Sequence, residues 1–425
     1  MSTRDLHIAY LVQQFPPEVG AGPARVTEMA QRWMEYGAEV TAITGIPSTK
    51  VPGRAYGEGD PKYRGRFFIE ENWDGIRVLR SWLYRNRKPG MLPVLANNVS
   101  FMATSVLNAV NKLGDADVLI ASAPPLFPHI SGAVVARARH IPLVLEIRDL
   151  WPDYLVDLGM LRRDAFATRI LFALERALLL AASRVVVVTE SFRTRVIAKG
   201  IPPERVAVIP NGVDLEQYRP EPNAGRQLPF PELERRDGEF VVGYLGTFGA
   251  GQDLESTIHA AALVAQEDRT IRFILVGDGP RRADLERAVE AHKLSSVSMH
   301  LPIVKDQTRA FYNACDACLV PLADVPVFQE TIPSKIFEIM ACERPVIASL
   351  DGEARRIVEQ SGGGIVAKPG DARAIADAVL RAKRLSSGER AAMGRAGRAY
   401  VTAHYQRSML ADRYLELLRS AVAHP

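Results

Sequence analysis

The first half of the chain alternates short apolar runs with longer amphipathic segments. Six runs are apolar on both faces, and helical patterns separate most of them: Ile8–Val12, Val40–Thr44, Val118–Ala121, Leu143–Ile147, Val185–Val188 and Val206–Ile209. Such runs, with helices between them, are typical of a parallel sheet that is covered on both sides. This half of the chain therefore predicts a doubly wound α/β domain.

The same alternation starts again after residue 238. Five further runs predict strands: Phe240–Leu245, Phe273–Val276, Val297–Leu301, Ala317–Val320 and Val346–Ala348. We therefore expect two Rossmann-like α/β domains with parallel sheets, at residues 1–213 and 239–407. Between them, residues 214–238 contain four prolines, several charges and little periodicity, which is typical of a linker.

The composition is that of an ordinary globular protein. The 425 residues are 47% hydrophobic and 24% charged, with a net charge of +4. This mildly basic balance, without a dense Lys/Arg run, favours a site for anionic small molecules over a nucleic-acid surface. Charges interrupt the densest apolar stretch, Ile170–Val188, so we expect no membrane span. The N-terminus lacks the apolar core of a signal peptide, and we expect a cytoplasmic protein.

The cysteines and acidic pairs do not indicate a metal site. Cys315 and Cys318 form a C-x-x-C pair, but no second pair with metal-ligand spacing accompanies them, so we interpret them as structural. Asp115 and Asp117 stand before a predicted strand, where a role in the turn is the better interpretation. We expect neither a metal nor another cofactor.

The segment ETIPSKIFEIMACERPVIAS, residues 330–349, carries the densest set of candidate ligand-binding groups. Its Pro-Ser pair predicts a helix start at Ser334, which places Lys335 in the first turn beside backbone N–H groups that attract phosphate. Glu338 then lies within the helix, and Glu330 lies on the preceding loop. The spacing alone leaves open whether these groups bind one ligand or face water.

Glycine-bearing loops follow the first strand of each predicted domain. Gly20 and Gly22 stand in the first loop, and Gly246 and Gly249 flank Thr247 in the second. Glycine lets backbone N–H groups approach an anion closely, so both loops are candidate phosphate contacts. The alternative is that each is only a tight turn. Neither loop has the dinucleotide-binding spacing G-x-G-x-x-G, which disfavours a dehydrogenase.

The E-x7-E spacing of residues 330–349 and the strand after it resemble the nucleotide-sugar motif of glycosyltransferase family 4. The P-S-K-x-F-E form resembles the bacterial fucosamine-transferase-like branch, which builds O-antigen, capsule and exopolysaccharide. RDLWPD at 148–153, IPNGVD at 209–214 and GDGP at 277–280 extend the resemblance over nearly the whole chain. It implies the GT-B fold, in which two Rossmann-like domains face across a cleft and the C-terminal helix, here residues 408–422, packs on the first domain.

The resemblance also implies roles for the motif residues. Glu338 would bind the ribose, Glu330 the donor sugar and Lys335 the diphosphate. The implied activity is retaining hexosyl transfer from a nucleotide-diphosphate sugar, with a UDP-sugar as the first expectation and no metal. The further donor-side candidates are Gly246, Thr247, Gly249, Gly277, Arg282, Ser334 and Ile336.

The chain departs from the family pattern in two places. The second-domain loop GTFGAGQDL lacks the arginine and lysine that many members carry, so phosphate binding would depend on Lys335, backbone amides and Arg282. Arg148 and Asp149 stand where many members have a histidine, at a strand end that should border the site. Asp149 would receive the acceptor proton or orient the acceptor hydroxyl; the alternative is a buried structural pair with Arg148. His129 is a further acceptor-side candidate, although a lone histidine beside prolines is more often structural.

Residues 85–113 combine basic and apolar positions. Helical spacing predicts a core face formed by Leu95, Val99, Met102, Val106, Val110 and Leu113. Outside that face stand Arg85, Arg87, Lys88, Met91, Leu92 and Val94. Such a cluster fits a protein that lies on anionic lipid headgroups at the inner face of the plasma membrane, with a lipid-linked acceptor. A loop that contacts a small-molecule acceptor is the alternative.

Two other functions fit the same fold. A sugar-nucleotide 2-epimerase would need acid and base groups near the sugar C2 atom and no second substrate. A catalytically silent subunit would bind the nucleotide sugar without transferring it. We expect a transferase with no nucleic-acid partner.

Overall fold

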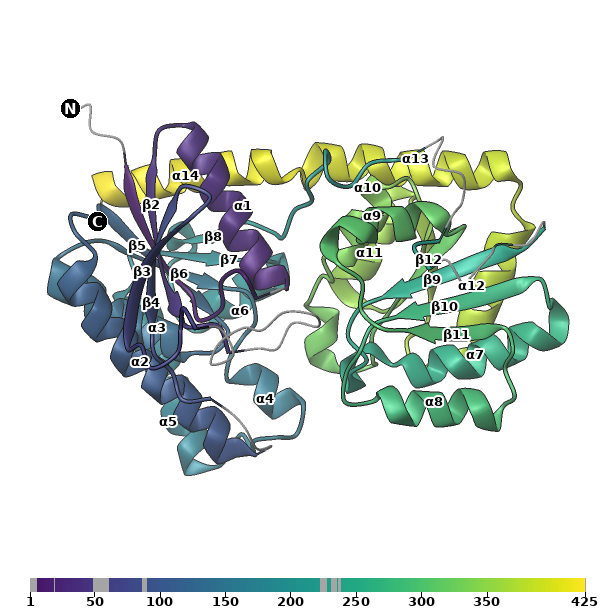
Figure 1. Cartoon of the computed structure of the whole chain (residues 1–425), viewed down its shortest axis with the longest axis horizontal. Coiled ribbons are helices and arrows are strands. Elements are labelled where there is room, and N and C mark those ends of the chain that lie inside the picture. Colours follow the sequence, from purple (N-terminus) through teal and green to yellow (C-terminus); the bar gives the residue numbers. More distant parts are fainter. Residues whose placement is uncertain are drawn as a thin grey trace. The chain divides into compact units, whose positions relative to one another are not determined.

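The computed structural model describes residues 6–18, 20–48, 61–85, 90–221, 228–230, 235 and 238–424. The chain divides into two compact units (Figure 1): unit 1 is Met1–Asn211 with Arg407–Pro425, and unit 2 is Gly212–Gln406. Residues 214–238, the predicted linker, fall within unit 2 and lie partly outside the described residues.

Unit 1 is built on a sheet of eight described strands. Their bounds are β1 His7–Leu11, β2 Glu39–Gly45, β3 Phe68–Trp73, β4 Ile76–Ser81, β5 Val118–Ala123, β6 Leu143–Ile147, β7 Arg184–Val187 and β8 Val206–Val208. They lie in the order β3-β4-β2-β1-β5-β6-β7-β8, and only the β3–β4 pair is antiparallel. The sequence pattern did not predict this hairpin, whose turn residues Asp74 and Gly75 both have positive φ. An Asp-Gly pair between two short strands is the signal that indicates it.

Helices cover both faces of this sheet. Their bounds are α1 Ala21–Glu35, α2 Met91–Lys112, α3 Phe127–Arg139, α4 Asp153–Asp157, α5 Phe166–Ala181, α6 Glu190–Ala198 and α14 Arg407–Ala423. α1 and α14 pack on one face, where the rings of Trp33 and Tyr414 meet edge to face. α2, α3, α5 and α6 pack on the other face. Figure 1 shows α14 and α1 on the opposite side of the sheet from α2, α3 and α5.

Unit 2 repeats this plan with six described strands, all parallel. Their bounds are β9 Phe240–Leu245, β10 Ile271–Val276, β11 Val297–His300, β12 Ala317–Pro321, β13 Val346–Ser349 and β14 Gly364–Ala367. They lie in the order β11-β10-β9-β12-β13-β14. The helices are α7 Leu254–Glu267, α8 Arg282–Ala291, α9 Lys305–Ala314, α10 Lys335–Ala341, α11 Gly352–Ser361, α12 Ala372–Arg384 and α13 Ser387–His404. α7, α8 and α12 cover one face, and α9, α10, α11 and α13 cover the other.

The predicted core face of α2 is partly wrong. Leu95 and Val99 are exposed to 45% and 41%, whereas Phe101 and Asn108 are buried. Asn108 Nδ2 donates to the carbonyl oxygen of Arg80 on β4 at 3.0 Å. Polar side chains therefore occupy part of the inner face, because they find backbone partners there, and apolar side chains stand outside.

Part of the predicted membrane-contacting cluster cannot be placed, because it falls on residues that the structure does not describe. Arg87, Lys88 and the side chain of Met91 lie outside the described residues. Among the helices that the structure describes, none is both long enough and apolar enough to cross a bilayer.

A buried ion pair joins α1 to the centre of the unit 1 sheet. Arg25 Nε donates to Glu146 Oε1 at 2.9 Å, and Arg25 Nη2 donates to the carbonyl oxygen of Ile209 at 2.9 Å. Glu146 Oε2 accepts from Tyr10 Oη and Ser122 Oγ, both at 2.7 Å. Burial alone would raise the pKa of Glu146, but the positive charges and these hydrogen bonds outweigh it and lower the pKa. The pair fastens the segment after β8 to α1.

We predict that Arg25→Met destabilises unit 1 by about 3–5 kcal/mol, because it leaves the Glu146 carboxylate buried without its cation. All four tryptophans, Trp33, Trp73, Trp82 and Trp151, belong to unit 1. Urea unfolding followed by tryptophan fluorescence therefore reports on this unit. Arg32→Met, which removes a partly exposed ion pair with Glu35, should cost less than about 1 kcal/mol. Equal midpoints for the two variants would contradict the role assigned to the buried pair.

Candidate functional site

The predicted donor residues gather at one edge of the unit 2 sheet. Gly246 follows β9, Gly277 follows β10, and Lys335 begins α10, which the chain reaches from β12 through the turn that carries Glu330. Because these strands are parallel, their carboxyl ends meet at the same edge. Residues almost ninety positions apart in the sequence thus become neighbours.

Lys335 lies against the second-domain glycine loop. Its Nζ atom is 4.3 Å from the centroid of the Tyr244 ring, and it stands so close to Gly246 that a side chain there would overlap it. Tyr244 Oη donates to the carbonyl oxygen of Thr247 at 2.8 Å. The enclosing protein atoms lower the pKa of Lys335 to about 8, and the negative charge of Glu338 opposes this shift. The lysine is therefore a partly desolvated cation held beside the glycine loop.

Two tyrosines hold the Glu338 carboxylate. Tyr312 Oη donates to Glu338 Oε2 at 3.0 Å, and Tyr218 makes a second side-chain hydrogen bond to Glu338. Burial raises the pKa of Glu338, while the Tyr312 bond and Lys335 act in the opposite direction. Sequence reasoning missed both tyrosines, because neither stands in the 330–349 segment.

The glycine loops after β9 and β10 pack against each other. A side chain at Gly277 would overlap the carbonyl of Gly246, and one at Gly279 would overlap the backbone of Phe248. Arg282 Nη1 donates to the carbonyl oxygen of Gly277 at 2.8 Å, and its Nε donates to Glu286 at 2.8 Å. Arg282 thus supports the loop from α8 and is already paired. Close packing explains these glycines without a ligand. Their backbone N–H groups are also paired, since Gly246 donates to the carbonyl oxygen of Val276 at 2.9 Å and Gly277 donates to that of His300 at 3.0 Å.

The loop that carries Glu330 rests on a residue that the sequence did not single out. A short 3-10 turn, Pro326–Gln329, ends at Glu330. Gly352, the first residue of α11, has φ of +74° and lies so close to the backbone of Gln329 that any side chain would overlap it. The sequence signal was the Asp-Gly pair before the helix. The close contact between Gly352 and the Gln329 backbone holds the loop that carries Glu330 against the start of α11.

The remaining donor-side candidates differ in their surroundings. Ile336 is completely buried in the unit 2 core, so only its backbone can contact a ligand. Ser334 occupies the N-cap position of α10, but its side chain does not cap the helix. Thr247 is exposed, and Gly249 borders Gln252 on the same loop.

The acceptor-side candidates lie at the carboxyl edge of the unit 1 sheet. Arg148 follows β6 and donates from Nε to Ser122 Oγ at 3.0 Å. Its guanidinium group covers Gly22, where a side chain would overlap it, while Gly20 is the N-cap of α1. Asp149 makes no hydrogen bond through its carboxyl group to any other described residue. Burial raises its pKa to about 6, although the charge of Arg148 opposes the rise.

The contacts of His129 differ from those of Arg148 and Asp149. It is buried on α3, and its Nε2 atom lies 3.1 Å from the carbonyl oxygen of Glu146. Burial lowers the pKa of His129 to about 4, so the ring is neutral at physiological pH. These contacts favour the structural alternative.

The cysteines and the acidic pair have structural surroundings. All three cysteines are buried, and Cys315 Sγ lies 3.2 Å from the carbonyl oxygen of Phe311. Asp117 accepts a hydrogen bond from the His7 backbone N–H at 2.7 Å. Within the described parts of the chain, no three His, Cys, Asp or Glu side chains are grouped to hold a metal ion.

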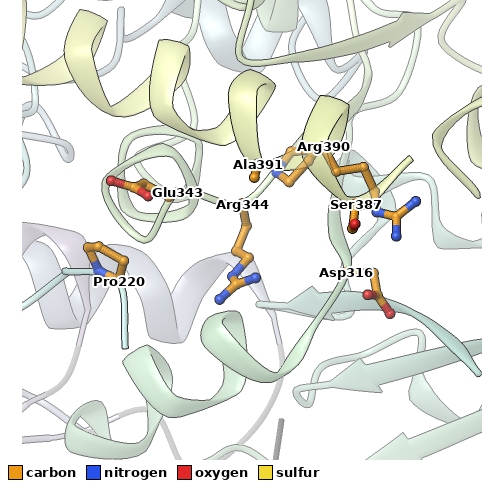
Figure 2. Close-up of a pocket in the computed structure, with 8 residues that line it drawn as sticks. Pro220, Asp316, Glu343, Arg344, Ser387, Arg390 and Ala391 are labelled. Carbon is orange, nitrogen blue, oxygen red and sulfur yellow. The ribbon is translucent and has the colours of Figure 1, made fainter. Parts of the chain in front are cut away.

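A cavity of about 230 Å³ lies elsewhere in unit 2 (Figure 2). Asp316 immediately precedes β12, and Arg344 and Pro345 immediately precede β13. The cavity is therefore at the amino edge of the sheet, opposite the edge where Lys335 lies. None of the predicted site residues lines it.

Comparison with known families covers both units. Residues 20–212 match the family described as "Glycosyl transferase 4-like domain". Residues 239–384 match the family described as "Glycosyl transferases group 1". The second match includes Lys335, Glu330 and Glu338.

Individual relatives are distant. The probable glycosyltransferase WbjE of Pseudomonas aeruginosa is 28% identical over 61% of this chain and 64% of its own length. The putative colanic acid biosynthesis glycosyl transferase WcaI of Escherichia coli is 25% identical over 79% of this chain and 80% of its own. The structure of HepE from Anabaena in complex with UDP and glucose has a TM-score of 0.68 and 19% identity, covering 98% of this chain and all of HepE. This last likeness shows the fold.

We predict that affinity for a diphosphate ligand depends on the charge of Lys335. Because its pKa is about 8, the ammonium form is complete at lower pH and is lost as the pH rises through 8. Above about pH 7 the affinity for UDP should fall, by as much as about tenfold per pH unit. Calorimetric titration across this range measures it. Lys335→Arg, which stays charged, should flatten the profile; an unchanged fall in that variant would assign the titration to another group.

We also predict that Tyr244 positions Lys335 through its ring. Tyr244→Leu removes the aromatic face below the ammonium group and should weaken UDP binding about three- to thirtyfold. Tyr244→Phe keeps the ring and loses only the hydrogen bond to Thr247, so it should bind within about threefold of the wild type. Equal losses in both variants would instead assign the role to the hydroxyl group.

Proposed function

Because this chain belongs to glycosyltransferase family 4 and is a glycosyltransferase, we propose that it transfers a hexosyl group from a UDP-sugar to an acceptor with retention of configuration. The observation that carries the proposal is the partly desolvated Lys335 ammonium group beside Gly246. A nucleotide diphosphate leaving group needs such a cation, because negative charge develops on it as the glycosidic bond breaks. The complexes of HepE with UDP and glucose support UDP as the carrier.

Donor recognition would use three groups of the motif. Lys335 binds the diphosphate, Glu338 accepts hydrogen bonds from the ribose hydroxyls, and Glu330 contacts the sugar. Glu338 is suited to its part because Tyr312 already fixes one carboxylate oxygen. The proposed mechanism uses no metal, because Lys335 supplies positive charge at the diphosphate.

The chemical step would break the bond between the anomeric carbon and the β-phosphate oxygen. Negative charge then develops on the leaving diphosphate, where Lys335 stabilises it. The acceptor hydroxyl attacks the same face of the sugar, and its proton passes to the leaving phosphate oxygen. Configuration at the anomeric carbon is thereby retained.

The acceptor would bind to unit 1. Asp149 has a carboxyl group without a hydrogen-bond partner among the described residues and a pKa of about 6, so it is largely ionised at neutral pH. Such a group can accept a hydrogen bond from an acceptor hydroxyl and orient it. Arg148, which covers Gly22, adds a positive charge beside it.

We further propose a role in the synthesis of a cell-surface polysaccharide. WcaI is named for colanic acid biosynthesis, and the P-S-K-x-F-E motif resembles the same branch. Acceptors of such pathways are carried on lipids, so the protein would work peripherally at the inner face of the plasma membrane.

We predict that Lys335→Ala and Glu338→Ala lower kcat/KM for the UDP-sugar by roughly ten- to a hundredfold or more. The physical reason is the loss of a charge-assisted hydrogen bond worth about 1.5–3 kcal/mol. Transfer of a radiolabelled sugar to extracted lipid acceptor measures the effect. Cys315→Ser, which changes a buried residue away from the motif, is the matched control.

Near-wild-type kcat/KM in Lys335→Ala would remove the basis of the site assignment. Incubation with UDP-N-acetylglucosamine alone separates the alternatives: a 2-epimerase would convert it without an acceptor. A silent subunit would show a thermal shift with UDP-sugars and no transfer.

A further inference from the structure

The outer face of α2 is apolar and uncharged. Leu92 is exposed to 76% and Leu107 to 57%, and Leu95 and Val99 stand between them on the same side of the helix. No charged residue occurs from Met91 to Asn111. A helix that faces water normally carries charges on its outer side. This face therefore lacks the residues that would keep it in solvent.

α5 carries a second exposed apolar stripe. Phe166 is exposed to 79% and Ile170 to 51%, and Leu180 continues the stripe at helical spacing. The loop before the helix adds Met160, which is exposed to 58%. Single exposed apolar residues need no explanation, but two stripes on one side of a domain indicate an interaction surface.

The two stripes belong to the same side of unit 1. α2 and α5 both pack on the sheet face that α3 and α6 also cover, and α3 contacts both helices. α2 follows β4 and α5 follows β6, which run in the same direction. The exposed first turns with Leu92 and Phe166 therefore lie at the same edge of the sheet, on either side of α3.

The charges around the α5 stripe are mainly positive. Residues 158–181 contain four arginines, Arg162, Arg163, Arg169 and Arg176. Asp164 is the exposed acid in this segment and pairs with Arg162 at 2.9 Å, and Arg163 pairs with Asp153 at 3.0 Å. Arg169 and Arg176 have no ion pair among the described residues. Glu175 is buried and pairs with Lys199 at 2.6 Å. Positive charge beside exposed leucine, isoleucine and phenylalanine complements an anionic bilayer surface.

We propose that the outer faces of α2 and α5 form one docking surface for an anionic lipid bilayer. Leu92, Leu95, Phe166 and Ile170 enter the boundary between headgroups and acyl chains, and Arg169 contacts the lipid phosphates. This proposal rests on the lipid-linked acceptor of the proposed function. The residues that form the surface all lie in unit 1, and none of them belongs to the donor site.

A second copy of the chain fits this surface less well. In a twofold dimer the same patch meets itself and brings the positive charges of Arg169 and Arg176 to the same interface, while Asp164, the exposed acid of residues 158–181, already pairs with Arg162. An anionic membrane places phosphates opposite the same arginines.

The test is co-sedimentation with vesicles of phosphatidylcholine that contain about 30% phosphatidylglycerol. The wild-type chain should pellet with these vesicles and remain in the supernatant with pure phosphatidylcholine. Leu92→Gln/Leu95→Gln and Phe166→Gln/Ile170→Gln should each lower the partition coefficient about tenfold or more. Arg169→Glu should weaken binding most at low salt.

Leu301→Gln/Val304→Gln is the matched control, because both residues are 65% exposed but lie in unit 2. Its partition coefficient should equal that of the wild type. Thermal shifts with a UDP-sugar, measured on all variants, show whether donor binding persists independently of the vesicles. Wild-type protein left in the supernatant at low salt overturns the proposal. So does a stable dimer in light scattering that Phe166→Gln/Ile170→Gln dissociates.

Discussion

Strand direction decides where chemistry can gather in this protein. In each unit neighbouring parallel strands deliver their following loops to one edge of the sheet. In unit 2 that edge holds Gly246, Gly277 and Lys335, and the carbonyl of Gly246 lies so close to Gly277 that a side chain at position 277 would overlap it. In unit 1 the corresponding edge holds Arg148 and Asp149. The cavity beside Arg344 is at the amino edge of its sheet, and none of the candidate site residues lines it.

Hydrogen-bond and ion-pair partners distinguish the buried charged groups that stabilise the fold from those that are available to a ligand. Glu146 receives hydrogen bonds from Arg25, Tyr10 and Ser122, which lower its pKa and leave it no capacity for chemistry. Asp149, three residues further on, has no such bonds among the described residues, and burial raises its pKa to about 6. Among the described residues Lys335 likewise has no direct ion pair, and burial lowers its pKa to about 8. Burial disfavours the charged forms of Asp149 and Lys335. A bound ligand of suitable charge or polarity would stabilise those charged forms.

The sequence predicted the parallel strands well, because these depend on local patterns. The two sheets, the start of α10 at Lys335 and the glycine loops all follow from short segments. The sequence could not show that Tyr244 lies below Lys335 or that Tyr312 donates to Glu338, because those pairs come from different strands and helices. Gly352 was missed for the same reason: its constraint is the backbone of Gln329, more than twenty residues earlier. The contacts between segments decide which of the candidate charges are already satisfied.

α2 shows how a periodic pattern can indicate the wrong face. Its apolar residues repeat at helical spacing, and burial of that stripe was the simplest interpretation. The structure instead buries Phe101 together with Asn108, because the carbonyl of Arg80 on β4 offers Asn108 a hydrogen-bond partner at 3.0 Å. The amide nitrogen of Asn108 is satisfied, but its Oδ1 atom has no partner among the described residues, so burial of this side chain is only partly compensated. The exposed Leu95 and Val99 side chains gain no stabilisation in water, and contact with an apolar surface would remove them from it.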